Sequence, residues 1–159
     1  MTFYQDMPEN SKVWIYQSNR PFREVEVDGI RHKLKTFLEN WQAHGNNLIA
    51  FGDVYYSQFV VLMVDEKEAK ASGCSIDTSV HFIEELGKIY EVDFFDRLSI
   101  AYVFENQVKV VSKNEFKQLL KSGELSNETI VFNNLIKNKL EFENKWKIPV
   151  KASWHKTLV

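Results

Sequence analysis

The sequence predicts a single α+β domain with a ferredoxin-like core, in which strands and helices follow the order β-α-β-β-α-β. Short runs of β-branched and aromatic residues alternate with two long amphipathic segments, as this fold requires. The chain has 159 residues, which is the size of one domain. Hydrophobic residues make up 44% of it and aromatic residues 14%, which is enough to fill a core and excludes a disordered chain.

The first half supplies one strand, a helix, a hairpin and a second helix. Residues 1–12 form a polar lead, and residues 13–17 read as a strand. From Asp28 a helix is expected, ending at His44-Gly45. Its apolar face consists of Ile30, Leu34, Phe37, Leu38 and Trp41. Residues 48–55 and 58–64 predict a hairpin, and the apolar run 59–64 predicts a strand covered on both faces. A second helix is expected over 76–90, with Ser75 as its N-cap.

The second half adds a hairpin and two C-terminal helices to this core. Residues 98–104 predict the fourth core strand, in an antiparallel or mixed sheet, and 108–111 predict the extra hairpin strand. Ser112 and Glu115 form a capping-box pattern for a short helix that ends at Gly123. A brief strand is expected over 129–132 and a last helix over 134–146, with Leu135, Ile136 and Leu140 inward. Residues 150–159 are expected to form an extended tail.

Composition and charge exclude several classes of function. The net charge is −2, whereas proteins that bind nucleic-acid backbones usually carry a basic excess. The aromatic hairpin could stack bases, but residues 45–66 contain no Lys or Arg, so RNA binding is not expected. The single cysteine, Cys74, allows no internal disulfide. The chain shows no secretory signal and no apolar run long enough to cross a bilayer, so a cytoplasmic protein without membrane contact is expected.

Common motifs for phosphate, cofactor and metal binding are missing. The sequence contains no Gly-x-x-x-x-Gly-Lys-Ser/Thr loop, no Gly-x-Gly-x-x-Gly turn and no His-Glu-x-x-His helix. Its four histidines share no ligand spacing, and one cysteine cannot build a Cys-rich zinc site. We therefore predict no cofactor and no metal.

The segment 71–77 is the strongest candidate site. Small residues precede a helix start, where backbone N–H groups and the helix dipole favour an anion. The residues expected to bind it are Ser72, Gly73, Cys74 and Ser75. The same position would lower the pKa of a thiol. Asp77 and His81 follow on one helix face, so a nucleophilic cluster with Cys74 is geometrically possible. The alternative is that Ser75 only caps the helix and Cys74 only fills space.

Two further segments combine aromatic and polar residues. Residues 93–97 place Asp93 and Asp96 beside Arg97, a pattern that fits an acid/base or anion site. The alternative is that Phe94 and Phe95 anchor the loop and that Asp96 or Arg97 forms a structural ion pair. In residues 153–156, Trp154 and His155 either close over a cavity or pin the tail to the core.

Five segments together resemble a small bacterial family whose members are often labelled "ABC transporter ATPase". They are 14–20 (WIYQSNR), 71–77 (ASGCSID), 92–97 (VDFFDR), 131–134 (VFNN) and 153–155 (SWH). The resemblance implies no activity, substrate or catalytic residue. The label is not supported, because the sequence has no P-loop, no Walker B acid and no signature motif.

Three functions from different classes are consistent with these patterns. The first is binding of a small anionic ligand or a protein partner at residues 72–77, with Arg97 and His81 contributing. The second is a small enzyme with Cys74 as nucleophile, His81 or His155 as base, and Asp77 or Asp96 as orienting acid. The third is a non-catalytic homodimer formed through a sheet edge or the aromatic hairpin. The sequence favours a binding protein over an enzyme.

Overall fold

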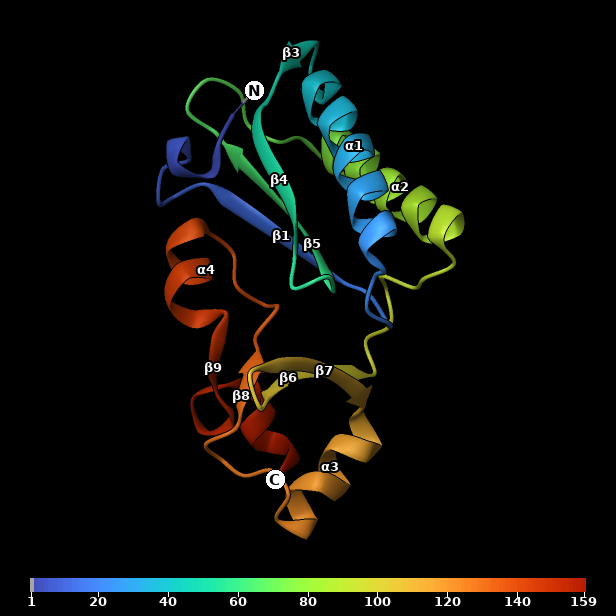
Figure 1. Ribbon diagram of the computed structural model, residues 1–159. Coiled ribbons are helices and arrows are strands. Elements are labelled where there is room, and N and C mark those ends of the chain that lie inside the picture. Colours follow the sequence, from blue (N-terminus) through green and yellow to red (C-terminus); the bar gives the residue numbers. More distant parts are fainter. Residues whose placement is uncertain (1) are drawn as a thin grey trace.

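The first sheet carries both long helices on one face (Figure 1). The computed structural model describes residues 2–159. Strand order in this sheet is β1-β5-β4, and both pairings are antiparallel. A short hairpin precedes β4. The elements are β1 (Lys12–Gln17), α1 (Glu24–Asn40), β2 (Gln42–Ala43), β3 (Asn46–Asn47), β4 (Ile49–Tyr55), β5 (Phe59–Asp65) and α2 (Gly73–Tyr90). The α+β class is therefore confirmed.

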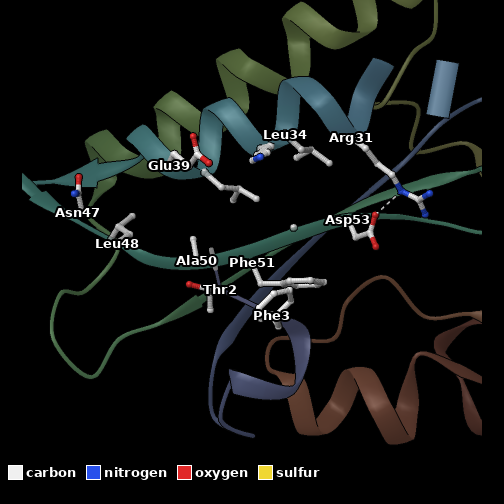
Figure 2. A pocket seen from close by; sticks show the side chains of 13 residues that line it. Thr2, Phe3, Arg31, Leu34, Glu39, Asn47, Leu48, Ala50, Phe51 and Asp53 are labelled. Atoms are coloured by element: carbon white, nitrogen blue, oxygen red, sulfur yellow. Dashed lines mark hydrogen bonds and ion pairs between the residues drawn. The ribbon is translucent and has the colours of Figure 1, made fainter. Parts of the chain in front are cut away.

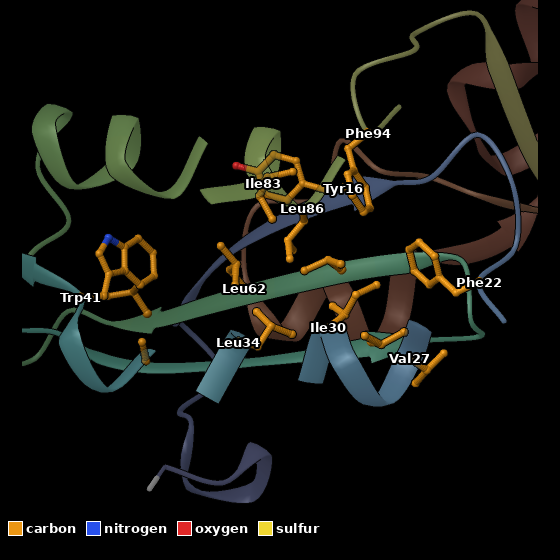
Figure 3. Close-up of a cluster of buried hydrophobic side chains, with 14 of the residues drawn as sticks. Tyr16, Phe22, Val27, Ile30, Leu34, Trp41, Leu62, Ile83, Leu86 and Phe94 are labelled. Carbon is orange, nitrogen blue, oxygen red and sulfur yellow. The ribbon is translucent and has the colours of Figure 1, made fainter. Parts of the chain in front are cut away.

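The core between the helices and this sheet uses the predicted apolar face of α1. Ile30, Leu34 and Trp41 are buried there against Leu62 of β5 and Ile83 of α2 (Figure 3). Phe37 stacks on Phe82 with ring centroids 4.3 Å apart, and Trp41 donates from Nε1 to the Ser75 carbonyl at 2.8 Å. These contacts fix the start of α2 against the end of α1.

Helix α1 is displaced from its predicted bounds at both ends. It begins at Glu24, because the Glu26 carboxylate accepts the Arg23 N–H at 2.9 Å and closes the first turn. It ends at Asn40. His44 and Gly45 have φ of 53° and 80° and instead form the turn of the β2–β3 hairpin.

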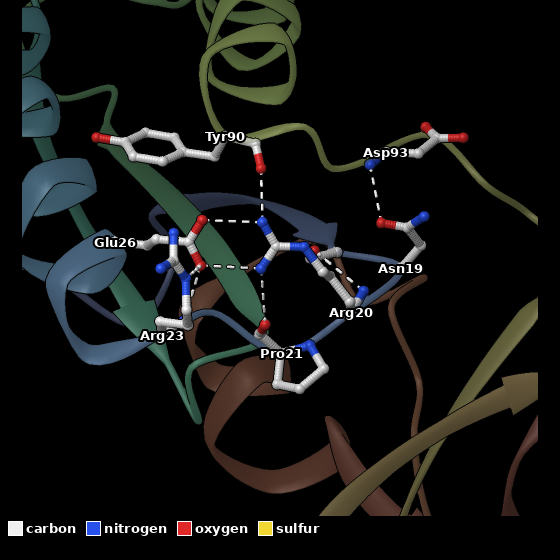
Figure 4. Close-up of polar contacts among 8 residues, drawn as sticks. Asn19, Arg20, Pro21, Arg23, Glu26, Tyr90 and Asp93 are labelled. Carbon is white, nitrogen blue, oxygen red and sulfur yellow. Dashed lines mark hydrogen bonds and ion pairs between the residues drawn. The ribbon is translucent and has the colours of Figure 1, made fainter.

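An ion pair joins the start of α1 to the end of α2. Arg20 donates to both Glu26 carboxylate oxygens at 2.8 Å and to the Tyr90 carbonyl at 2.6 Å (Figure 4). Glu26 is only 4% exposed, so its charge depends on this partner.

A second sheet contains the strands of the C-terminal half. Its order is β7-β6-β8-β9, all antiparallel. The elements of the C-terminal half are β6 (Ser99–Phe104), β7 (Gln107–Ser112), α3 (Lys113–Ser122), β8 (Ile130–Phe132), α4 (Lys139–Lys145) and β9 (Lys147–Pro149). Ser112 caps α3 as predicted, accepting from the Glu115 N–H at 3.1 Å, and Gly123 ends the helix with φ +85°. The reciprocal bond from the Ser112 N–H to the Glu115 carboxylate, which would complete the predicted capping box, is not formed.

The ferredoxin-like sheet does not form, because its fourth strand lies in the second sheet. That arrangement requires β6 to pair beside β1. Instead β6 has β7 on one side and β8 on the other. The outer edge of β1 is occupied by the residues before α4. The Val13 N–H donates to the Lys137 carbonyl at 3.0 Å, and Lys12 forms an isolated antiparallel β-bridge with Asn138.

The second half covers the other face of the first sheet. Phe59, Val61 and Met63 of β5 point away from the helices and pack with Phe132 and Trp146. Strand β5 is therefore buried on both faces, as its continuous apolar run predicts. The two sheets share one hydrophobic cluster.

The C-terminal third differs from the prediction in two respects. Helix α4 begins only at Lys139, because Asn138 is its N-cap and accepts from the Glu141 N–H at 2.9 Å. Leu135 and Leu140 are consequently exposed, whereas Ile136 is buried. The tail is not extended. It forms two 3₁₀ helices, η2 (Val150–Ala152) and η3 (Trp154–Leu158), which bury Val150 and Leu158 against α3 and the second sheet.

The polar N-terminal lead is held by a buried lysine. Lys139 donates from Nζ to the carbonyls of Tyr4 and Met7 at 2.9 and 2.6 Å, and its ammonium lies 4.2 Å from the centre of the Tyr4 ring. A short 3₁₀ turn, η1 (Tyr4–Asp6), is thereby fixed beneath β4.

Candidate functional site

The first turn of α2 is closed by two reciprocal serine hydrogen bonds. Ser72, rather than the predicted Ser75, is the N-cap, and its Oγ accepts from the Ser75 N–H at 3.1 Å. Ser75 Oγ accepts from the Ser72 N–H at 2.7 Å. The Ile76 N–H donates to the Ser72 carbonyl at 2.9 Å. The anion site expected at Ser72, Gly73, Cys74 and Ser75 thus has fewer free donors than the sequence predicts.

The residues of the predicted enzyme cluster have separate partners. Cys74 is exposed at the start of α2. The His81 ring lies 3.5 Å from the Glu84 carboxylate. His155 is buried and contacts Ser153. Within residues 2–159 no hydrogen bond connects the Cys74 thiol to His81, His155, Asp77 or Asp96, so no nucleophile–base pair is assembled.

A cavity of about 590 Å³ lies where the end of β1 meets the second sheet. We call it the inter-sheet cleft. Its lining residues come from five parts of the chain: Ile15, Tyr16 and Gln17 of β1, Val80 of α2, 94–97 and 99–101 in and after the α2–β6 loop, Phe132, Asn134 and Leu135 around the end of β8, and Trp154 and His155 of η3. Of the sequence-predicted site residues, the cleft brings together Asp96, Arg97 and His155.

The cleft also unites four of the five segments that carry the family resemblance. Segments 14–20, 92–97, 131–134 and 153–155 all contribute lining residues. The fifth segment, 71–77, reaches a neighbouring cavity through Ile76, and that cavity shares Ile15, Tyr16, Asn134 and Leu135 with the cleft. These segments are distant in sequence and are brought together by the fold.

Amide side chains form a hydrogen-bond chain between the two sheets. Asn134 Nδ2 donates to Gln17 Oε1 at 2.9 Å, and Gln17 Nε2 donates to the Ser99 carbonyl at 3.3 Å. Trp146 Nε1 donates to Asn134 Oδ1 at 2.9 Å. These hydrogen bonds fix the Gln17 and Asn134 side-chain amides at the cleft, where they lie next to its apolar lining.

The C-terminal turn presents an indole beside a neutral imidazole. Ser153 caps η3, and the Trp154 and His155 rings stack with centroids 3.8 Å apart. Burial lowers the pKa of His155 to about 4. The ring is therefore uncharged at neutral pH and does not act there as a cation.

The α2–β6 loop presents Phe95 and Arg97 at the cleft. Asp93 Oδ1 accepts from the Phe95 N–H at 2.8 Å, and Asp96 Oδ1 accepts from the Leu98 N–H at 2.8 Å. Asp96 Oδ2 also accepts from the Ser99 hydroxyl, and these bonds lower the pKa of Asp96. Both carboxylates thus hold the loop, whereas Arg97 has no hydrogen-bond or ion-pair partner anywhere in the described chain.

Large apolar side chains stand exposed around Arg97. Phe95 is 44% exposed, Leu135 68% and Trp154 38%, and all three line the cleft. Phe95 is oriented by an edge contact with Tyr16 at 5.9 Å. Exposed apolar groups gathered beside an unpaired cation are typical of a binding surface.

Comparisons with protein-family models, curated proteins and solved structures gave no match for this chain. Among residues 2–159, no three His, Cys, Asp or Glu side chains gather closely enough to hold a metal ion. No helix in the described part of the chain has the length and apolar character needed to cross a membrane.

Sequence reasoning missed Gln17, Asn134, Phe95 and Leu135 as cleft residues. Gln17 and Asn134 each follow an apolar strand segment. This pattern indicates a polar residue at the end of a strand, but it does not predict which residues contact it. Leu135 was expected inside a helix, and its exposure follows from the late start of α4.

Proposed function

We propose that this protein is a binding protein whose inter-sheet cleft takes a small molecule with a planar apolar body and one anionic group. The observation that carries the proposal is the placement of Arg97, without a protein partner, among the exposed side chains of Phe95, Leu135 and Trp154. The cleft volume of about 590 Å³ suits such a ligand.

Each part of the cleft has a distinct role in this proposal. The Arg97 guanidinium binds a carboxylate or phosphate in bidentate fashion. Trp154 and Phe95 contact the faces of the planar body. Gln17 and Asn134 each keep one free N–H and one free oxygen lone pair for a polar ring substituent.

Binding without chemistry is favoured because the acids and bases near the cleft have structural partners. Asp96 uses both oxygens to hold its loop, and His155 contacts Ser153 and stacks on Trp154. Cys74 does not line the cleft.

The test is calorimetric titration with three probes: indole-3-carboxylate, phenyl phosphate and the uncharged indole-3-carboxamide. We expect both anionic probes to bind at least about tenfold more tightly than the amide, since a hydrogen bond to a charged group contributes about 1.5 kcal/mol or more. Arg97→Ala should remove this preference, Trp154→Ala should weaken all three probes, and the exposed-lysine control Lys117→Ala should change none.

The same titration followed by amide NMR separates the cleft from the helix start. Shifts at Arg97 and the Trp154 indole N–H support the proposal. Shifts confined to Gly73 and Cys74 would place the anion at the start of α2 and overturn it. Unchanged affinity in Arg97→Ala, or no binding of either anionic probe at millimolar concentration, would also overturn it.

A further inference from the structure

A second cavity, of about 490 Å³, adjoins the inter-sheet cleft along the outer edge of β1. The two cavities share four lining residues, which are Ile15, Tyr16, Asn134 and Leu135. Consecutive residues 12–16 line the second cavity, and their side chains alternate between the two faces of the sheet. The second cavity therefore lies beyond the strand edge rather than over one face, and we call it the edge cavity.

The cleft and the edge cavity follow β1 one after the other. Ile76 of α2 lines the edge cavity, and Val80, one turn later on the same helix, lines the cleft. Lys137 lines the edge cavity and Gln17 the cleft. The Lys137 carbonyl is bonded to Val13, and the strand advances about 13 Å from Val13 to Gln17. An elongated molecule can therefore occupy both cavities at once.

The main chain of Ile15 is unpaired where the two cavities meet. The Ser18 N–H donates to the Gln58 carbonyl in continuation of the β1–β5 ladder, so odd-numbered residues of β1 face away from β5. One of them, Val13, donates to the Lys137 carbonyl at 3.0 Å. No hydrogen bond from any of residues 2–159 reaches the N–H or C=O of Ile15. Both groups are therefore available to an amide of a bound molecule.

Positive charge without a partner lies in each of the two cavities. Lys12 and Lys137 line the edge cavity, and no Asp or Glu of residues 2–159 lines it. The Lys12 ammonium lies 3.4 Å from the Glu66 carboxylate, whereas the Lys137 ammonium has no hydrogen-bond or ion-pair partner in the described chain. Arg97, which also lacks a partner there, lines the cleft. The two cavities thus offer one free cation each.

The groove between β4 and α1 lacks this excess of positive charge (Figure 2). Its volume is about 560 Å³, but Arg31 in its lining already lies 2.8 Å from the Asp53 carboxylate. Lys35 and Glu39 of the same helix add one further charge of each sign. The charges lining this groove therefore balance, whereas those lining the edge cavity are basic.

We propose that the ligand of the inter-sheet cleft is an elongated dianion that continues along β1 into the edge cavity. The inference rests on the proposed function and adds a second half to the ligand. Its planar body and first anionic group occupy the cleft, an amide-linked chain crosses at Ile15 beside the exposed Leu135 side chain, and a second anionic group binds Lys137. The ligand is thus an aromatic acid joined through an amide to a second acid, with about 13 Å between its anionic groups.

Three probes isolate the contribution of the second charge. N-(4-carboxybenzoyl)-4-aminobutyrate carries both acids, its terminal carboxamide analogue keeps the length but only the aromatic acid, and 4-carbamoylbenzoate represents the half that occupies the cleft. In calorimetric titrations the dianion should bind at least about threefold more tightly than the terminal carboxamide, which is the scale of an ion pair with an exposed lysine.

Substitutions assign that preference to its residue. Lys137→Gln should abolish the preference for the dianion and leave the affinity for 4-carbamoylbenzoate unchanged, because Lys137 does not line the cleft. Arg97→Ala should weaken all three probes. The matched control Lys35→Ala, an exposed lysine of the β4–α1 groove, should change none of them.

Amide NMR separates a failure of this inference from a failure of the proposed function. The dianion should shift the Ile76 and Lys137 signals in addition to those of Arg97, whereas 4-carbamoylbenzoate should shift the cleft signals alone. If 4-carbamoylbenzoate binds at the cleft but the dianion has no advantage over its carboxamide, or keeps that advantage in Lys137→Gln, the second anion site is overturned and the proposed function stands. If none of the three probes binds at millimolar concentration, both are overturned.

Discussion

The buried carboxylate of Glu26 makes the free energy of unfolding depend on pH in the acid range, because its hydrogen-bond partners are fixed. Hydrogen bonds from the Arg20 guanidinium, followed by the Arg23 N–H, lower the pKa of Glu26 from 4.5 to about 2. Because the folded-state pKa is depressed, the stabilisation is fully present above pH 4.5. It is lost as the pH falls through about 2.

We predict that Glu26→Gln lowers the free energy of unfolding at pH 7 by about 2 kcal/mol, the scale of charge-assisted hydrogen bonds. The difference from wild type should shrink between pH 4.5 and about 2, because protonation removes the same charge. Urea denaturation at several pH values measures it. Glu24→Gln, one helical position from the cap and exposed, is the matched control. A pH-independent difference would contradict the assignment of the charge to Arg20.

At the scale of single elements, the start of a helix can be predicted from the sequence where the capping residue and the apolar spacing agree. The start of α3 is predictable, because Ser112 lies where its side chain can cap a helix, and α3 begins directly after it. The 134–146 segment was not, because its apolar spacing continues through Asn138. A cap at Asn138 competes with that spacing, and two tertiary bonds decide: Lys139 N–H to the Ser11 carbonyl at 3.0 Å and Leu140 N–H to the Glu9 carbonyl at 2.9 Å.

We predict that Ser112→Ala destabilises the protein by about 1 kcal/mol, since the Glu115 N–H loses its acceptor. Ser112→Asp should restore most of this, because an aspartate accepts the same bond and suits the positive end of the helix. Chemical denaturation of the three proteins provides the comparison. Ser122→Ala, at the other end of α3, serves as the control. Equal losses for the Ala and Asp variants would show that Ser112 stabilises by another route.

At the scale of the whole molecule, strand existence was predictable but sheet membership was not. Alternation in residues 99–104 is the same whether β6 pairs with β1 or with β8. The choice depends on partners remote in sequence: Val131 pairs with Tyr102, and residues 137–138 occupy the β1 edge. The cleft shares this dependence, because Gln17, Arg97, Asn134 and Trp154 become neighbours only once both sheets are placed.

Trp146 connects the two sheets. It is 3% exposed, stacks on Phe142 at 4.7 Å, meets Phe59 of the first sheet and Phe132 of the second at 5.0 Å, and holds Asn134 at the cleft. Aromatic clusters of this kind couple the elements that contribute to them. The two sheets are therefore expected to unfold as one unit.

We predict that Trp146→Ala costs about 3 to 5 kcal/mol, as truncation of a buried tryptophan usually does. It should also accelerate amide hydrogen exchange in β5 and β8 alike, because the cavity it creates lies between both sheets. Trp154→Ala, at the exposed rim, should cost under about 1 kcal/mol and leave exchange in β5 unchanged. Faster exchange restricted to β8 would mean that the first sheet is stable without the second, and that the inter-sheet cleft is a boundary between two independent folding units.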